Sequence, residues 1–160
     1  MMTKTISFVL VLCFLGGISF AEPITQERLK QKVFSTSYDQ VWKALEETIV
    51  QDLHMQIRTN DKENGTIETY TFEFDETKEY TEKIILKEKN TKRVYKTGNY
   101  RSVVSVTKNS DGTITVKPVF NISLWKPLNP GGEYLVVESS GYLEDELLTK
   151  LSKKLTVSNK

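Results

Sequence analysis

The chain has 160 residues, of which 38% are hydrophobic, and its 22 basic and 21 acidic side chains give a formal charge of +1. This near-neutral balance provides no general electrostatic attraction to nucleic acid or to anionic lipid, so we expect no nucleic-acid partner. The length is sufficient for a real hydrophobic core.

The N-terminus has the three parts of a secretory signal. Lys4 provides the positive start, residues 6–14 form an apolar run, and residues 19–21 form a small-residue cleavage site. The run is shorter than the roughly 18 to 20 apolar residues that a membrane-spanning helix needs. We therefore predict a signal peptide over 1–21, cleaved between Ala21 and Glu22, and export to the periplasm or to the extracellular medium.

Cys13 is the only cysteine and lies inside the apolar run. It follows Leu12, whereas the acylated cysteine of a lipoprotein normally follows a small residue. Lipidation is therefore the less favoured interpretation, although it keeps peripheral association with a membrane open. Cleavage removes this thiol, so residues 22–160 contain no cysteine for a disulfide, a thiolate metal site or a nucleophile. We expect these residues to form a single domain that is stabilised by packing.

A short first strand is predicted at 31–34, and an amphipathic helix follows it. Ser37 and Gln40 have the spacing of a capping box, which marks the start of the helix. The apolar residues recur at intervals of three and four and form one stripe: Tyr38, Val41, Trp42, Leu45, Ile49 and Val50. Such a stripe must be covered, and we predict that a sheet covers it and that Trp42 is a core residue.

Alternating apolar and polar residues predict one strand at 53–58 and a second at 66–74, joined by a turn at 60–65. The second strand would place Tyr70, Phe72 and Phe74 on one face. From 75 to 99 the pattern is weaker; short strands at 82–86 and 93–95 fit it, and the strand order there is left open.

The clearest hairpin in the chain joins 101–107 to 113–125, because Asp111-Gly112 supplies the positive φ that a tight connection needs. One face of its second strand is expected to be core and consists of Ile114, Val116, Phe120, Ile122 and Leu124. Pro118 removes a donor from the ladder, which indicates an edge position or a bulge.

The chain ends with a Pro-Gly loop at 126–132, a short apolar run at 134–137 and a closing helix that Ser139 and Ser140 cap. The apolar stripe of this helix consists of Leu143, Leu147, Leu148, Leu151 and Leu155. The whole order predicts an α+β fold: an antiparallel sheet of four to six strands with two helices packed on one face.

Residues 22–160 contain no recognisable catalytic set. His54 is the only histidine, and it has neither a second histidine nor a cysteine to complete a metal site. There is no Gly-x-Ser-x-Gly motif and no phosphate-binding glycine loop. We therefore expect no enzyme, no metal and no cofactor, with His54 as a structural or surface residue. A hydrolase that uses two carboxylates remains a third alternative, because sequence does not give the separation of such acids.

Trp125 lies at the end of a predicted strand, beside the Pro-Gly loop, where a large amphipathic ring can stay partly exposed and anchor a partner. The alternative is that it is a core residue. The predicted partner-binding residues are Trp125, Pro127 and Tyr134.

A family resemblance rests on the first half of the domain. It consists of Val33-Phe34, the helix Ser37-Tyr38-Asp39-Gln40-Val41-Trp42-Lys43-Ala44-Leu45, the pair Met55 and Ile57, and the turn and strand from Asp61-Lys62-Glu63-Asn64-Gly65 to Thr69. These residues resemble the opening of the helix-grip domains of BamC-like proteins, which are lipoprotein accessories of the machinery that assembles outer-membrane β-barrels. The helix from Tyr142 to Leu155 resembles the closing helix of that family, and between these parts only the pattern agrees.

The resemblance implies a binding or scaffold module of the cell envelope with an envelope protein as its partner, and it implies no catalytic residue. Two features depart from the family, because Cys13 has no lipobox and only one domain is present. The same helix start also resembles START-like helix-grip domains. That similarity implies the alternative function, a carrier whose cavity between sheet and last helix holds an apolar small molecule or lipid.

Overall fold

The computed structural model describes residues 30–75, 78–85, 97–128 and 130–158. The predicted signal peptide, its cleavage site at Ala21 and Glu22, Cys13 and the strand proposed at 93–95 lie outside the described residues. In the described part of the chain, no helix is both long enough and apolar enough to cross a membrane.

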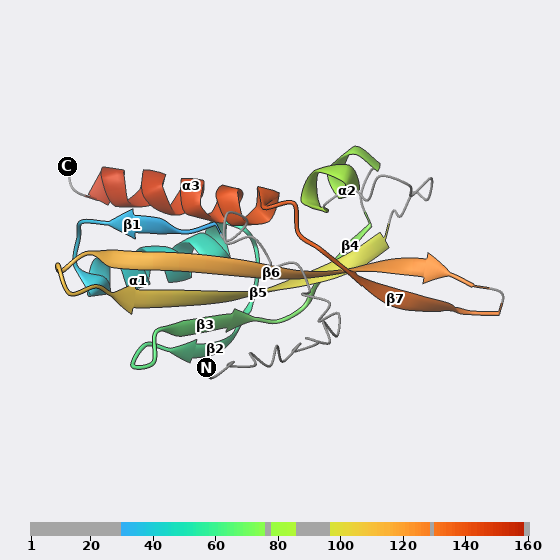
Figure 1. Ribbon diagram of the computed structural model, residues 1–160, viewed down its shortest axis with the longest axis horizontal. Helices are drawn as coiled ribbons and strands as arrows, with labels where there is room; N and C mark the ends of the chain where they lie inside the picture. The colour runs from blue at the N-terminus through green and yellow to red at the C-terminus, as the bar shows by residue number, and fades with distance from the viewer. Residues whose placement is uncertain (1–29, 76–77, 86–96, 129, 159–160) are drawn as a thin grey trace, which may run out of the picture.

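Seven strands and three α-helices form the described structure (Figure 1). The strands are β1 (Lys32–Phe34), β2 (Ile57–Asp61), β3 (Thr66–Thr69), β4 (Phe72–Asp75), β5 (Thr97–Lys108), β6 (Ile114–Pro127) and β7 (Gly132–Val137). The helices are α1 (Tyr38–Glu47), which continues into the π-helical turn η2 (Thr48–Asp52), α2 (Lys78–Ile84) and α3 (Tyr142–Ser158).

The sheet is antiparallel and is organised around the long β5–β6 hairpin. Its order is β1-β6-β5-β3-β2 at one end, while β4 pairs with β5 and β7 pairs with β6 farther along the same two strands. The hairpin register runs from Lys108 opposite Ile114 to Gly98 opposite Leu124. The Asp111-Gly112 turn is as predicted, since Gly112 has a φ of 82°.

One face of the hairpin carries the core. Successive side chains of a strand point to opposite faces, and all the predicted core residues of β6 are buried, together with Pro118 on the same face: Ile114, Val116, Phe120, Ile122 and Leu124. The buried stripes of α1 and α3 belong to the same cluster, so both helices cover this face. The predicted α+β fold is confirmed, although the sheet has seven strands rather than four to six and α2 is a third helix.

The start of α1 is as predicted and its end is not. Ser37 Oγ accepts from the Gln40 N–H, and both halves of the capping box are present. After Glu47 the helix widens into η2, whose i→i+5 bond joins the Leu53 N–H to the Thr48 carbonyl at 3.0 Å. A π-helical turn changes the angular spacing of side chains. Val50 directly follows the buried Ile49, and consecutive residues of a helix do not share a face, so Val50 lies off the apolar stripe and is 50% exposed, contrary to the prediction.

The strand predicted at 53–58 begins later, at Ile57. His54 has a φ of 54° and the Met55 N–H bonds to the Ile49 carbonyl, so the chain is still closing the helix at these positions. The His54 side chain is exposed. Alternation alone did not distinguish this helix end from a strand.

The strand predicted at 66–74 is two strands. Ile67 and Phe74 are both buried, although their odd separation would place them on opposite faces of one continuous strand. The break between β3 and β4 allows both side chains to face the core. Tyr70 lies in this break and is 55% exposed. Opposite the break, Thr69 Oγ1 accepts from the Ser102 N–H at 2.9 Å.

The strand predicted at 82–86 is wrong for most of its length, because residues 78–84 form helix α2. Tyr80, Thr81 and Ile84 recur at helical spacing, and Thr81 and Ile84 are buried. After α2, Ile85 forms an isolated antiparallel β-bridge with Ser139.

Pro118 lies at a local edge of β6, as predicted. β1 pairs with residues 114–116 and β7 with residues 122–127, so neither strand reaches the segment between them. The buried Glu144 of α3 fills part of this gap, since its Oε1 accepts from the Phe120 N–H at 3.1 Å and its Oε2 accepts from Ser139 Oγ at 2.8 Å. No described strand pairs with β6 at Pro118 on this side, so the missing N–H of the proline leaves no carbonyl of a neighbouring strand without a donor.

Trp42 is a core residue, as predicted, and is 2% exposed. Its ring stacks on Tyr38 with centroids 5.6 Å apart, and its indole N–H donates to Glu46 Oε1 at 3.2 Å. It belongs to the same buried cluster as the core face of β6.

Replacing Trp42 with alanine should lower the free energy of unfolding by about 3 to 5 kcal/mol, because a large buried side chain loses both transfer energy and packing. Trp125→Ala is the matched control, since Trp125 is only partly buried, and its loss should be clearly smaller. Chemical denaturation of both variants measures the difference. A larger loss for Trp125→Ala would contradict the assignment of the α1 stripe to the core.

Candidate binding surfaces

The β6–β7 hairpin ends in an arm that projects from the body of the molecule (Figure 1). The name "arm" is used here for residues 122–127 of β6 together with β7. The Leu128 N–H donates to the Gly131 carbonyl at 2.7 Å near the tip. Hydrogen-bonded and non-hydrogen-bonded pairs alternate along an antiparallel ladder. Counting from the hydrogen-bonded pair Leu128 and Gly131, the facing residues Trp125 and Tyr134 form a non-hydrogen-bonded pair, in which side chains lie closest.

Trp125 and Tyr134 form an edge-to-face aromatic pair on the side of the arm opposite the core. Their ring centroids are 5.0 Å apart and their planes are inclined by 63°. Gly132 makes room for the indole, since a Cβ at this position would lie 2.3 Å from Cζ2 of Trp125. The indole therefore lies across the backbone of β7, and its position is determined by the hairpin itself.

The same side of the arm exposes further apolar surface. Tyr134 is 48% exposed and Val136, two residues along on the same face, is 84% exposed. Leu128, just beyond the end of β6 at the tip of the arm, is also 45% exposed. Lys126 and Glu133 pair at 2.9 Å. Contiguous exposed apolar side chains of this kind mark binding surfaces more often than scattered ones do.

The structure brings the predicted partner-binding residues together. Trp125 and Pro127 lie on one face of β6, Tyr134 faces Trp125 from β7, and Pro127 is exposed. Sequence analysis missed Val136, because its contribution depends on the pairing of β7 with β6. The apolar run at 134–137 was the available signal.

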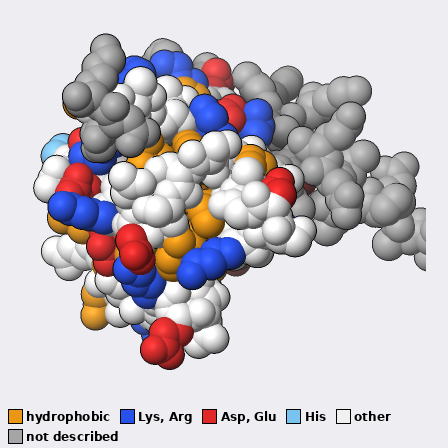
Figure 2. All heavy atoms as spheres, turned by 90° about the vertical axis from the view of Figure 1, so that its left-hand side faces the viewer, with side chains coloured by type: hydrophobic (Ala, Val, Ile, Leu, Met, Phe, Trp, Pro, Cys, Tyr) orange, Lys and Arg blue, Asp and Glu red, His pale blue; other side chains and the backbone are white. Residues whose placement is uncertain are grey.

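A cleft of about 700 Å³ lies at the opposite end of the molecule, where the β2–β3 turn, the end of β5 and the start of α1 meet. We call it the Tyr38 cleft. Its lining residues are Tyr38, Asp39, Lys62, Glu63, Asn64, Gly65, Val106, Thr107 and Lys108. Figure 2 shows this end of the molecule, with charged side chains of both signs and hydrophobic side chains visible between them.

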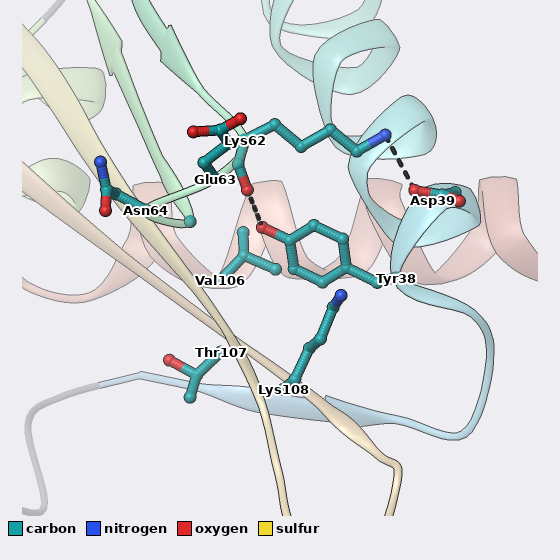
Figure 3. A pocket seen from close by; sticks show the side chains of 9 residues that line it. Tyr38, Asp39, Lys62, Glu63, Asn64, Val106, Thr107 and Lys108 are labelled. Atoms are coloured by element: carbon teal, nitrogen blue, oxygen red, sulfur yellow. Dashed lines mark hydrogen bonds and ion pairs between the residues drawn. The ribbon is translucent and has the colours of Figure 1, made fainter.

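Tyr38 is fixed from three sides (Figure 3). Its hydroxyl donates to the Lys62 carbonyl at 2.8 Å, its ring stacks on Trp42, and the Lys108 ammonium lies 4.4 Å from the ring centroid. The last contact is a cation–π interaction. Burial raises the pKa of the Tyr38 phenol, so the hydroxyl remains a donor at neutral pH.

Lys62 and Asp39 form an ion pair across the cleft, with Nζ and Oδ1 2.8 Å apart. The hydrogen bond from Lys62 holds the pKa of Asp39 below its usual value, and the bond to Asp39 raises the pKa of Lys62. Asp39 stays ionised until the pH falls below the usual pKa of an aspartate. Lys62 stays protonated until the pH rises above the usual pKa of a lysine. The pair therefore persists at neutral pH, although exposed pairs of this kind contribute little to stability.

The turn that forms one wall of the cleft is held by local hydrogen bonds. Asp61 accepts from the Asn64 N–H at 3.0 Å and from Asn64 Nδ2 at 2.8 Å, and these bonds lower the pKa of Asp61. Gly65 has a φ of 66°, and its carbonyl accepts from the Val106 N–H at 2.8 Å. A Cβ on Gly65 would lie 2.2 Å from the Val106 carbonyl oxygen, so the turn can approach β5 only with glycine here.

The described residues include no group of three or more His, Cys, Asp or Glu side chains placed to hold a metal ion. Within the Tyr38 cleft, Asp39 is engaged with Lys62 and the Glu63 carboxylate points away from the tyrosine ring (Figure 3). The cleft therefore does not present two carboxylates to one substrate position.

No protein-family model matches the chain, and no curated protein matches its sequence. The resemblance to BamC-like and START-like domains therefore remains a prediction from the residues quoted above.

Gly65→Ala should destabilise the domain more than Gly112→Ala. Both glycines have positive φ, which costs an alanine about 1 to 2 kcal/mol, but a Cβ on Gly112 meets no atom within 4 Å, whereas one on Gly65 meets the β5 backbone. Thermal or chemical denaturation of the two variants gives the difference in their stability, which reports the close contact of Gly65 with the backbone of β5. Equal losses would contradict the tight packing of the turn on β5.

Proposed function

We propose that this chain is an exported, non-catalytic binding or scaffold module of the cell envelope, and that its arm binds another envelope protein. The predicted signal peptide supports export, and the BamC-like resemblance supports a role as an accessory of outer-membrane protein assembly. The single observation that carries the proposal is the aromatic pair of Trp125 and Tyr134, held beside the exposed Val136 on a projecting hairpin.

The arm has the physical properties of a preformed binding surface. Tryptophan and tyrosine are enriched among residues that dominate binding free energies, because they bury much area with few rotatable bonds. Here the pairing across the strands and the space over Gly132 already determine the ring positions. Little side-chain entropy is then lost on association. The partner surface that fits is an apolar groove that accepts one face of a β-hairpin.

The chain offers matched controls for a test of this surface. Tyr134→Ala and Val136→Ser change the arm, while Tyr70→Ala and Val33→Ser change side chains of the same type that are 55% and 54% exposed elsewhere. We expect the parent and both controls to recover the same partner from envelope extracts. The arm variants should bind it at least about fivefold more weakly, the loss expected when a residue worth more than about 1 kcal/mol is truncated.

Binding measured with the purified partner gives the numbers, and a thermal melt of each variant shows that it is folded. Repeated capture that recovers no envelope protein, or equal losses for arm and control variants, would contradict the proposal.

A START-like carrier of an apolar molecule is the second candidate, and one observation favours it. Ser102 lies on the core face of β5, and its buried hydroxyl has no hydrogen-bond partner among the described residues. Such a group is normally satisfied by water or by a ligand. Aromatic contacts pack close by, however, since Tyr100 meets Phe120 at 5.8 Å and Phe74 at 5.9 Å between ring centroids.

Native mass spectrometry of the purified chain tests the carrier. If the alternative holds, an apolar molecule copurifies with the parent, and Ser102→Ala changes the bound fraction because the hydroxyl that the ligand would satisfy is removed. A spectrum with the protein mass alone, together with a melting temperature that added fatty acid does not change, would remove this candidate.

A further inference from the structure

The Tyr38 cleft contains an ammonium group, that of Lys108, which forms no ion pair with a described carboxylate, although, after the hydrogen bond from Lys62, its charge contributes to lowering the pKa of Asp39. Lys62 is paired with Asp39, whereas the described residues place no carboxylate within ion-pair distance of the Lys108 ammonium. The Lys108 ammonium is instead held 4.4 Å from the centre of the Tyr38 ring. Figure 3 shows the Lys62 side chain running to Asp39, the Lys108 side chain reaching toward the Tyr38 ring from the other side, and the Glu63 carboxylate pointing away from the ring. The Lys108 ammonium is therefore the cationic group of the cleft that is available to a further anionic partner.

The same cleft contains the open edge of a strand. The Val106 N–H of β5 points toward the β2–β3 turn, since it donates to the Gly65 carbonyl. Backbone groups two residues apart on a strand point to the same side, so the Lys108 N–H and carbonyl also point toward this turn. At Lys108 the ladder between β3 and β5 has already ended, because the residues of β5 that pair with β3 are 103–105. The backbone of Lys108 thus borders the cleft beside its own ammonium group.

We propose that the Tyr38 cleft binds the free carboxylate end of an extended peptide chain. The carboxylate pairs with Lys108 Nζ, and the last peptide group of the ligand bonds to the backbone of Lys108 at the end of β5. Capture of a terminal carboxylate and addition of a strand to a sheet edge are both recurring modes of peptide recognition. The volume of about 700 Å³ lies within the range of sites that hold small ligands.

A carboxylate fits this cleft better than a phosphate does. A phosphate monoester carries about −1.5 to −2 charges at pH 7 and is normally met by several positive groups. Here a single ammonium is unpaired, and the carboxylates of Asp39 and Glu63 also line the cleft. A singly charged group can pair with this one ammonium, whereas a second negative charge would meet no further unpaired cation among the described lining residues. This site is independent of the arm, so either proposal can fail without the other.

The test uses a blocked tripeptide of alanine with a free C-terminal carboxylate, the same tripeptide amidated, and inorganic phosphate as probes. Amide chemical shifts of the isotope-labelled protein are followed during titration with each. We expect the acid to shift the amide signals of Gly65, Val106 and Lys108, and the amidated peptide to bind at least about tenfold more weakly. A charge-assisted hydrogen bond of about 1.5 to 3 kcal/mol gives a difference of that size.

Lys108→Met should abolish the response and Lys108→Arg should keep it, while Lys153→Met, which changes an exposed lysine of α3 outside the cleft, should leave it unaltered. Added salt should weaken binding of the acid, because the pair is open to solvent. Equal shifts with acid and amide, an unchanged response in Lys108→Met, or binding of phosphate without binding of the acid would each overturn the proposal. The comparison of acid with amide needs no variant and so does not depend on how the substitutions fold.

Discussion

The β5–β6 hairpin is the element on which the rest of the structure depends. Every other strand except β2 pairs directly with one of its two strands, and β2 is attached through β3. Its core face is the surface that α1 and α3 cover. Because the side-chain period of a strand is two, a slip of one residue in this hairpin would turn the whole core face of one strand to solvent. The register that starts at the Asp111-Gly112 turn therefore determines both the core and the ends of the molecule.

The hairpin is longer than the strands that flank it, and each of its strands changes partner along its length. β6 passes from β1 to β7, and β5 passes from β3 to β4. Backbone polar groups at such gaps need other partners. The Glu144 carboxylate bonds to the Phe120 N–H in one gap, and the Thr69 hydroxyl bonds to the Ser102 N–H in the other. Two side chains thus let one continuous hairpin support two sheet regions.

This construction places two unlike surfaces at opposite ends of the same hairpin. At one end β6 continues with β7 beyond the helices and presents Trp125, Tyr134 and Val136. At the other end β5 finishes beside the start of α1, and Lys108 lies over Tyr38. One surface is apolar and projecting, and the other is concave and charged. A scaffold module that holds two partners, or two parts of one partner, would use such an arrangement.

Local pattern in the sequence predicted the parts that local physics determines: the capping box at Ser37, the leucine stripe of α3, the core face of β6 and the turn at Asp111-Gly112. It also led to the prediction that Trp125, Pro127 and Tyr134 bind a partner, because a strand end beside a Pro-Gly loop can be recognised from its residues. Their pairing with one another and their exposure came only from the position of β7.

Tertiary contacts decided the remainder. The break between β3 and β4 allows both Ile67 and Phe74 to reach the core. The alternation within 66–74 does not show which of its side chains face the core. Residues 78–84 became a helix because Thr81 and Ile84 are buried together, in a segment whose own periodicity was weak. The Tyr38 cleft joins residues 38, 62–65 and 106–108, which are far apart in the chain. The position of the Lys108 ammonium, which forms no ion pair with the described residues, depends on how three elements approach one another, and no single stretch of sequence contains that information.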